Sequence, residues 1–188
     1  MSTAPVFSID PRAFWHDPYP TLKAMREQAP IAYVPELDAT LMVKRDDIAL
    51  NEKLIDVFSS VQPGGLMTQL MGQNMMRKDG RDHRAERKAI FPAISPKTVK
   101  AVWRAAFEDM TDRVLDDLAP RKGADMTSDI ARRLAGEALC LVTGLTNMDW
   151  QTMDRVSQAM VDGCANYAGD PAIEAHCLTC VETIDQHV

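Results

Sequence analysis

A histidine and an arginine lie four residues apart in a short, strongly charged segment of the chain. The segment reads RKDGRDHRAERKAIFPAISP from residue 77 to 96, and the pair is His83 and Arg87. Residues four apart on an α-helix leave the same face, one turn apart. An imidazole and a guanidinium on one face suit a carboxylate or phosphate ligand. The spacing predicts an anion-binding face, and a solvated face with i,i+4 charge pairs is the alternative.

The elements that must position this pair follow from signals on either side of it. Asp79 is expected to cap the helix by accepting from its first free amides. Pro92 has no amide hydrogen, so the helix is expected to end near Phe91. Ser95 followed by Pro96 predicts the start of another helix.

Charge is distributed unevenly along the chain. The net charge is −6, yet residues 77–88 hold six Lys or Arg against three Asp or Glu. We therefore expect neither nucleic acid nor an anionic membrane as the partner of the whole molecule. A basic island in an acidic chain favours one anionic ligand or a docking surface.

Composition indicates an ordinary globular protein, with 46% hydrophobic and 26% charged residues. A chain of 188 residues can form one domain or one piece of a larger domain. The N-terminus lacks a cationic start followed by an apolar run, and no apolar segment is long enough to cross a bilayer. Four cysteines without a small-scaffold spacing predict free thiols in a reducing, cytoplasmic setting.

Apolar periodicity predicts a mainly α-helical fold with a small β-hairpin. Residues 5–20 are expected to be irregular, and strands at 31–34 and 40–43 flank the turn PELD. The other helices are expected at about 20–28, 46–50, 96–119, 128–143, 149–164 and 170–188.

Residues 58–76 differ from their surroundings. Glycines and a proline exclude a long regular element, yet the stretch carries many Leu and Met side chains. Long apolar loops in compact domains are often lids or binding loops, and simple packing of the loop on the core is the alternative.

The cysteines offer a second candidate site. Cys177 and Cys180 form a CxxC beside His176, a pattern that can bind zinc. Both cysteines fall on the apolar stripe of an expected helix, which favours buried thiols, and Cys140 and Cys164 are expected in the core as well. A zinc-binding module stays an alternative. No phosphate loop, nucleophile elbow or paired carboxylates indicate a catalytic group.

The order of these pieces resembles the N-terminal half of a soluble bacterial cytochrome P450, a haem-thiolate monooxygenase. The resemblance rests on 17–34, on FSS at 58–60, on 129–145 and above all on MMRKDGRDHRAERKAIFPAISPKTV at 75–99. It implies that 1–188 is the N-terminal portion of a single P450 domain. In the family the His and Arg of D-G-x-x-H-x-x-x-R hydrogen-bond the haem propionates, which implies this role for His83 and Arg87.

The same resemblance gives the 61–76 loop a role over the haem and along the substrate pocket. It implies Met75 and Met76 at the haem edge, and Leu70, Met71 and Gln73 in contact with substrate.

The activity implied is hydroxylation or demethylation of a small, mostly apolar organic substrate. The reaction uses O₂ and electrons from a ferredoxin or reductase, which the basic island could dock through Arg81, Arg84 or Lys88.

One departure from the family pattern matters. The resemblance implies a haem-ligating cysteine in a Gly-rich loop, preceded by a central oxygen-activating helix. None of the four cysteines lies in such a loop, so this polypeptide is expected to be inactive alone. An all-helical regulatory module that binds nucleic-acid phosphates or a small ligand remains a further alternative.

Overall fold

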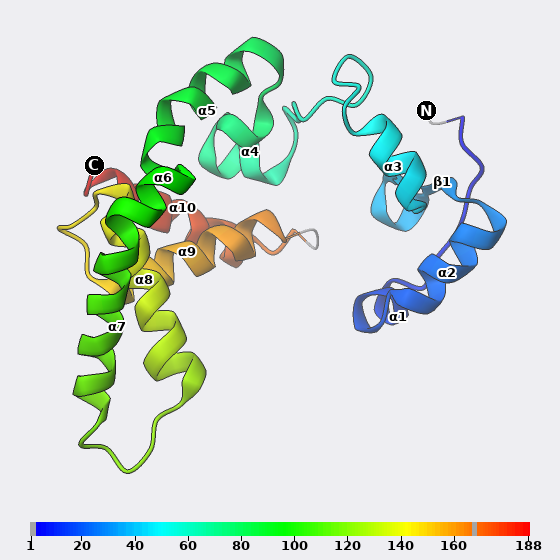
Figure 1. Cartoon of the computed structure of the whole chain (residues 1–188). Helices are drawn as coiled ribbons and strands as arrows, with labels where there is room; N and C mark the ends of the chain where they lie inside the picture. The colour runs from blue at the N-terminus through cyan, green and yellow to red at the C-terminus, as the bar shows by residue number, and fades with distance from the viewer. Residues whose placement is uncertain (1–2, 167–168) are drawn as a thin grey trace. The chain divides into compact units, whose positions relative to one another are not determined.

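The computed structural model describes residues 3–166 and 169–188, which form two compact units that divide after Ser59 (Figure 1). Each unit has a hydrophobic core of its own. The core of the first unit centres on Met25, and the core of the second unit centres on Val156.

The first unit, Met1–Ser59, is built on the predicted hairpin. Strands β1 (Ile31–Val34) and β2 (Ala39–Met42) pair antiparallel, joined by the short helix η1 (Pro35–Leu37). The N-terminal segment lies along the other edge of β1, where the Tyr33 amide donates to the Pro5 carbonyl at 2.9 Å. The hairpin prediction is confirmed.

Three helices complete this unit: α1 (Pro11–His16), α2 (Tyr19–Gln28) and α3 (Arg45–Asn51). The helices expected at 20–28 and 46–50 are confirmed, whereas the expectation of an irregular 5–20 segment is wrong. The Asp10 carboxylate accepts from the amides of Arg12 and Ala13 at 2.9 and 3.2 Å, and Pro11 occupies the first helical position. These two local signals are sufficient to start α1.

The second unit, Ser60–Val188, is helical throughout its described regular elements. Its elements are α4 (Leu66–Met71), η2 (Met75–Arg77), α5 (Gly80–Ile94), α6 (Pro96–Thr98), η3 (Val99–Trp103), α7 (Arg104–Leu118), η4 (Met126–Ala131), α8 (Arg132–Thr143), α9 (Trp150–Cys164) and α10 (Pro171–Asp185). Together with the hairpin they confirm a mainly α-helical fold with a small antiparallel sheet. The last helix ends at Asp185 and does not continue to Val188 as expected.

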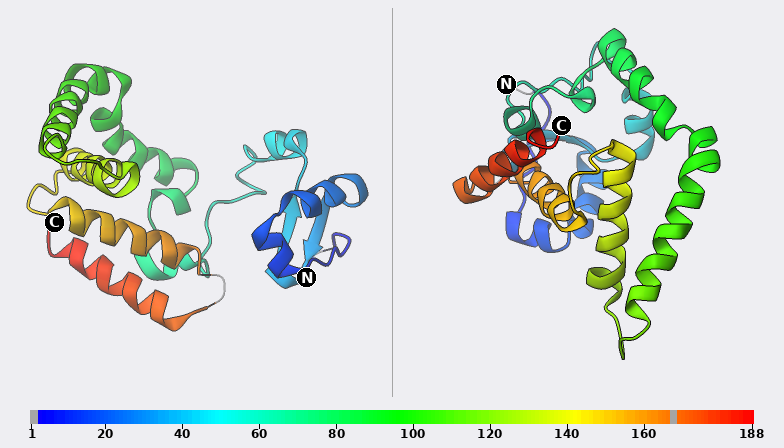
Figure 2. Two further views of the ribbon diagram at one scale, coloured as in Figure 1. Left: turned by 90° about the horizontal axis from the view of Figure 1, so that it is seen from below. Right: turned by 90° about the vertical axis from the view of Figure 1, so that its left-hand side faces the viewer.

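Helices α7 to α10 form the packed part of this unit, in which α8 contacts α7 and α9, and α9 lies beside α10 (Figure 2). Its core contains buried side chains from α8, the loop before α9, α9 and α10: Cys140, Met148, Met153, Val156, Ala159 and Cys180. The starts expected for α9 and α10 are confirmed, and each is capped: Asp149 accepts from the Thr152 amide and Asp170 from the Ala172 amide.

Helix α4 also packs onto this pair, at a glycine. A Cβ placed on Gly163 of α9 would lie 2.6 Å from the Sγ of Cys177 and 2.9 Å from the Cδ1 of Leu70. Only a residue without a side chain permits this approach, so Gly163 is the point at which α4, α9 and α10 meet.

Helix α5 continues through Pro92, so the prediction that it ends near Phe91 is wrong. Two side chains from the following helical segments satisfy carbonyls in its last turn. The Thr98 hydroxyl donates to the Pro92 carbonyl and the Trp103 indole donates to the Ala93 carbonyl, each at 2.6 Å. Because tertiary contacts stabilise the final turn, the amide missing at Pro92 does not terminate the helix. The Ser95–Pro96 start of the next helix is confirmed.

Candidate functional site

The N-terminus of α5 is held by the preceding loop. The Asp79 carboxylate accepts from the Ser60 amide at 3.0 and 3.2 Å and makes no cap bond to its own helix, so the expected capping role is wrong. A partner nineteen residues away therefore takes the place of the local amides. Gly80, the first residue of α5, has φ 55°, a left-handed conformation that glycine adopts without a Cβ penalty. Asp79 thus attaches the start of α5 to the preceding loop, and Gly80 allows the change in chain direction there.

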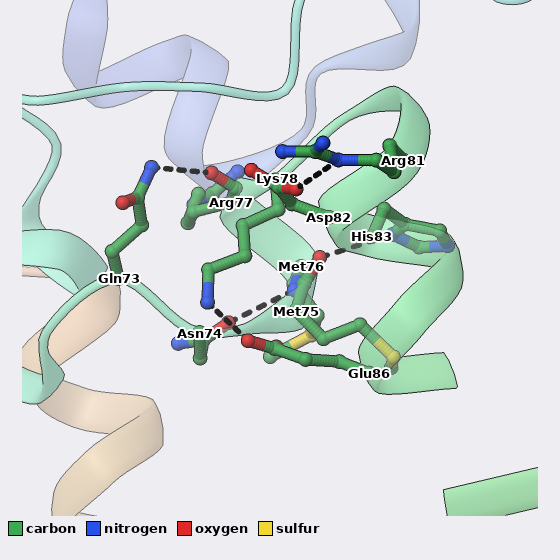
Figure 3. Close-up of polar contacts among 10 residues, drawn as sticks. All are labelled: Gln73, Asn74, Met75, Met76, Arg77, Lys78, Arg81, Asp82, His83 and Glu86. Carbon is green, nitrogen blue, oxygen red and sulfur yellow. Dashed lines mark hydrogen bonds and ion pairs between the residues drawn. The ribbon is translucent and has the colours of Figure 1, made fainter. Parts of the chain in front are cut away.

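His83 is half-buried on the first turns of α5, and its ring is oriented by the backbone of η2. Its Nδ1 lies 3.1 Å from the carbonyl oxygen of Met75 (Figure 3). A carbonyl only accepts, so Nδ1 carries the hydrogen of this bond. In the neutral ring Nε2 is then an acceptor, and it donates to an anion only when the imidazole is protonated.

Arg87 lies one turn further along α5 and is exposed. Two ion pairs lie near the start of α5: Arg81 with Asp82 at 3.2 Å, and Lys78 with Glu86 (Figure 3). The guanidinium of Arg87 has no hydrogen bond or ion pair to any residue that the structure describes. Charge pairing therefore accounts for Arg81 and Lys78, and it leaves Arg87 available for a ligand.

The face that carries this pair continues as an apolar surface. Helical spacing places His83, Arg87, Ile90, Phe91 and Ile94 on one stripe, called the α5 stripe below. The three apolar side chains are 44%, 47% and 46% exposed, and α5 has no buried residue. The α5 stripe thus presents an imidazole and a guanidinium at one end and uncovered apolar surface at the other.

The structure brings Met75 to this site and leaves Met76 more exposed. Met75 is half-buried in η2, and its carbonyl contacts His83. Met76 is 58% exposed, and its amide donates to the side chain of Asn74 at 3.0 Å. No local pattern predicts the contact between the Met75 carbonyl and the imidazole, because it joins residues from two different elements.

The three candidates for substrate contact occupy different environments. Leu70 is buried against Gly163, Met71 is half-buried, and Gln73 is exposed with its amide donating to the Arg77 carbonyl at 3.3 Å. Leu70 thus packs between α4 and α9, while Gln73 follows α4 in the loop that leads to η2.

The cysteines do not form a metal centre in the described parts of the chain. Cys177 and Cys180 are fully buried and Cys140 is 7% exposed, as predicted for core thiols. Burial raises the pKa of Cys140, Cys164 and Cys177, and for Cys164 the charge of Arg77 opposes the shift. A raised pKa favours the thiol over the thiolate that binds metals. Across 3–166 and 169–188, no three His, Cys, Asp or Glu residues are grouped to hold a metal ion, so the zinc alternative has no site there.

Within the same described residues, no helix combines the length and the apolar character that spanning a lipid bilayer requires.

Comparison with known proteins gives relatives by sequence. No protein-family model matches the chain. Cytochrome P450 130 of Mycobacterium tuberculosis is 24% identical over 169 residues, which cover 82% of this chain and 41% of the relative. Pulcherriminic acid synthase of Bacillus subtilis is 19% identical over 187 residues, which cover 97% of this chain and 45% of the relative. The chain therefore spans less than half the length of these curated relatives.

The fold is also found in a solved structure. The crystal structure of CalO2 superposes with a TM-score of 0.64 at 17% sequence identity, over 97% of this chain and 48% of the CalO2 chain. The similarity covers almost every element described above, including both compact units.

Proposed function

Since the chain belongs to the cytochrome P450 superfamily, we propose that residues 1–188 form the N-terminal part of a single haem-binding monooxygenase domain. Haem is the cofactor of this superfamily. The proposal is supported by a similarity that covers 97% of this chain but only 48% of CalO2. The remaining half of such a domain would come from further polypeptide.

The proposed reaction inserts one oxygen atom of O₂ into a small, mostly apolar organic molecule, by hydroxylation or demethylation. A ferredoxin or a reductase would supply the electrons. When bound, haem supplies the oxygen and electron-transfer chemistry, and the polypeptide supplies binding, orientation and exclusion of water.

The observation that carries this proposal is the exposed, unpaired Arg87 one turn from His83. An imidazole and a guanidinium on one helix face match two carboxylates at the edge of a flat apolar macrocycle. The apolar end of the α5 stripe agrees with a ligand whose acidic edge adjoins an apolar body. The residues of this chain therefore fit the carboxylates of haem, with His83 and Arg87 as their donors.

The cysteines of this chain do not fit the iron of haem as ligands. Three of the four cysteines are buried, Cys164 is half-buried, and burial favours the neutral thiol for Cys140, Cys164 and Cys177. Thiolate ligation needs a deprotonated sulfur. We expect the purified 188-residue chain to show no CO-induced Soret band at the thiolate position, and such a band would overturn the division of roles proposed here.

The 61–76 loop is proposed to enclose the substrate. Met71 and Gln73 would contact it, with Leu70 behind them, and Met75 and Met76 would lie at the haem edge. Flexible thioether side chains adapt to apolar ligands of varied shape. The contact of α4 with α9 and α10 supports this role, because it attaches the loop to the packed helices of the unit at Leu70.

The basic surface of α5 is proposed to dock an acidic electron donor. Arg81, Arg84 and Lys88 are all exposed there. Electrostatic attraction of this kind mainly raises the rate of association, and it is screened by salt.

Replacement of Arg87 by Ala in the haem-loaded protein that carries this sequence tests the propionate assignment. Hydrogen bonds to charged groups contribute about 1.5–3 kcal/mol, so haem transfer to apomyoglobin should become roughly 10- to 100-fold faster. Arg81→Ala is the matched control, since it removes an exposed arginine from a different face of α5 and should leave the rate unchanged. Equal rates for Arg87→Ala and the unmodified protein would contradict the assignment.

A further inference from the structure

Two buried polar atoms in the segment that leads into α5 have no hydrogen-bond partner among the residues that the structure describes. They are the Nε of Arg77 in η2 and the Oγ1 of Thr68 in α4, and both residues are half-buried. On the described residues that are not exposed, no other buried side-chain nitrogen or oxygen lacks a partner. An unpaired buried donor is costly, and a bound ion or ligand is one of the few explanations for such a group.

The arginines of the packed helices show what Arg77 lacks. Four of them each pair with an aspartate or glutamate from another segment of the unit: Arg113, Arg121, Arg132 and Arg133. Arg77 forms no ion pair with any residue in the described part of the chain. Removing a guanidinium from water without a compensating anion is unfavourable. The group missing beside Arg77 is therefore an anion.

Thr68 differs in a similar way from other threonines on helices. Four threonines of α7, α8 and α10 donate their hydroxyls to the carbonyl four residues earlier, at 2.7 to 3.0 Å: Thr111, Thr143, Thr179 and Thr183. For Thr68 that carbonyl belongs to Gly64, and it accepts instead from the side-chain amide of Gln69 at 2.8 Å. The hydroxyl of Thr68 is therefore free to bind a ligand.

The two segments that carry these residues approach the same end of α9. Leu70, two positions after Thr68 in α4, lies against Gly163. Burial raises the pKa of the Cys164 thiol and the charge of Arg77 opposes this shift, so the guanidinium lies within electrostatic reach of the next residue along α9. The last turn of α9 is thus the place at which α4 and Arg77 come together.

The backbone around Arg77 is fixed by its own segment. The Arg77 carbonyl accepts from the side-chain amide of Gln73 at 3.3 Å (Figure 3), and the Arg77 amide donates to the Asn74 carbonyl at 2.9 Å. The neighbouring cation, Lys78, is already paired with Glu86. A fixed backbone reduces the entropy that is lost when the guanidinium binds a ligand.

We propose that Arg77 and Thr68 bind a carboxylate of the substrate, so that the substrate is a mostly apolar molecule with one anionic end. A guanidinium forms charge-assisted hydrogen bonds to a carboxylate, and a hydroxyl adds a neutral one. Thioether side chains of the same segment, such as Met71, suit the apolar part of such a molecule. The inference rests on the proposed function, in which the 61–76 loop encloses the substrate, and it adds the chemical class of that substrate.

Isothermal titration calorimetry of the haem-loaded protein that carries this sequence tests the proposal. The probes are octanoate and 1-octanol, which have equal carbon chains and differ in the carboxylate. We expect octanoate to bind about tenfold more tightly than octanol, and Arg77→Met to weaken only octanoate, by about tenfold. Thr68→Val should weaken octanoate about threefold, because a neutral hydrogen bond contributes less.

Arg104→Met is the matched control, since it removes an exposed arginine from α7 and should leave both affinities unchanged. Unchanged binding of octanoate to Arg77→Met, or no binding of octanoate to the unmodified protein, overturns the proposal. Unchanged binding to Thr68→Val overturns the role of Thr68.

The stability of Arg77→Met separates ligand binding from a structural role. A cation near the C-terminal end of α9 can stabilise that helix through its dipole, and loss of Arg77 would then lower the urea midpoint. The proposal predicts that, without octanoate, the midpoint of the variant equals or exceeds that of the unmodified protein, because a buried charge without a partner is removed. Octanoate should raise the midpoint of the unmodified protein alone. A lower midpoint of the variant without octanoate overturns the proposal.

A haem propionate is the alternative source of a carboxylate, and haem dimethyl ester distinguishes the two sources. If Arg77→Met accelerates the loss of haem but not of the ester, the cofactor is the ligand of Arg77 and the substrate assignment is overturned. Failure of the proposed function gives a different result, because the protein then retains no haem. The calorimetry is therefore repeated on protein prepared without haem, where binding of octanoate that depends on Arg77 would still support the carboxylate site.

Discussion

Helices α5, α9 and α10 have the same length of fifteen residues but opposite environments. Helix α9 buries four residues, among them Met153 and Gly163, and packs along α10. Helix α5 buries none and carries the candidate ligand-binding pair. The difference indicates two roles within one unit. Helices α9 and α10 stabilise the fold, whereas α5 presents an exposed surface that can bind a ligand.

The largest difference in lost stability is expected between substitutions in the α9 core and substitutions on the α5 stripe. Met153→Ala should destabilise the chain by about 3 kcal/mol, because it empties a buried site in the α9 core. Ile94→Ala should cost no more than about 0.5 kcal/mol, since that side chain is 46% exposed. Urea unfolding followed by circular dichroism measures both. Similar losses for the two variants would show that α5 is as well packed as α9.

The second prediction concerns the close approach at Gly163. Gly163→Val should destabilise by about 2 kcal/mol, because its Cβ would lie 2.6 Å from the sulfur of Cys177. Gly123→Val is the control, since a Cβ there meets nothing within 4 Å, and its effect should stay within about 0.5 kcal/mol. Equal midpoints in urea would mean that α4, α9 and α10 are less tightly packed than described.

The third prediction addresses the imidazole of His83. Its Nδ1 donates to the Met75 carbonyl, which orients the ring on the face that carries Arg87. His83→Leu should therefore accelerate haem transfer to apomyoglobin about tenfold, because it removes a group that can hydrogen-bond a carboxylate.

His83→Arg serves as the control, because an arginine keeps a hydrogen-bond donor at this position. This variant should retain haem better than His83→Leu. Equal rates of haem transfer for His83→Leu and the unmodified protein would contradict the role proposed for His83.

The smallest effect is expected for the ion pair between α8 and α9. Arg132 donates to Asp154 at 3.1 Å, and this bond and the positive charge lower the pKa of Asp154 from 3.8. A carboxyl whose pKa is lowered on folding stabilises the fold above its unfolded value, and the contribution is lost as pH falls through the folded value. Asp154→Asn should therefore lower the urea midpoint slightly at pH 7 and not at all near pH 2, since exposed pairs contribute little. A larger loss of stability near pH 2 than at pH 7 would contradict a lowered pKa for Asp154.

The packed elements were largely predictable from the sequence. The starts of α9 and α10 and the hairpin are determined by residues within a few positions, such as Asp149, Asp170 and the turn PELD. The overlooked helix α1 also had a local signal in Asp10-Pro11. By contrast, the turn of α5 beyond Pro92 depends on Thr98 and Trp103, which a local pattern does not reveal.

The candidate site was predictable only in part, for the same reason. The spacing of His83 and Arg87 predicts their common face. The contact of Asp79 with the Ser60 amide spans nineteen residues, and the Met75 carbonyl that fixes the imidazole tautomer spans eight. Such contacts are formed by the fold and leave no periodic trace in the sequence.

A comparison of haem with its dimethyl ester, which lacks the two carboxylates, measures the interaction of α5 with the cofactor most directly. The holoprotein and its Arg87→Ala variant are each reconstituted with both compounds, and the four dissociation rates form a cycle that isolates the coupling between guanidinium and carboxylate. We expect Arg87→Ala to accelerate loss of haem roughly 10- to 100-fold and to leave loss of the ester unchanged. If the substitution accelerates loss of both compounds equally, Arg87 does not bind the propionates.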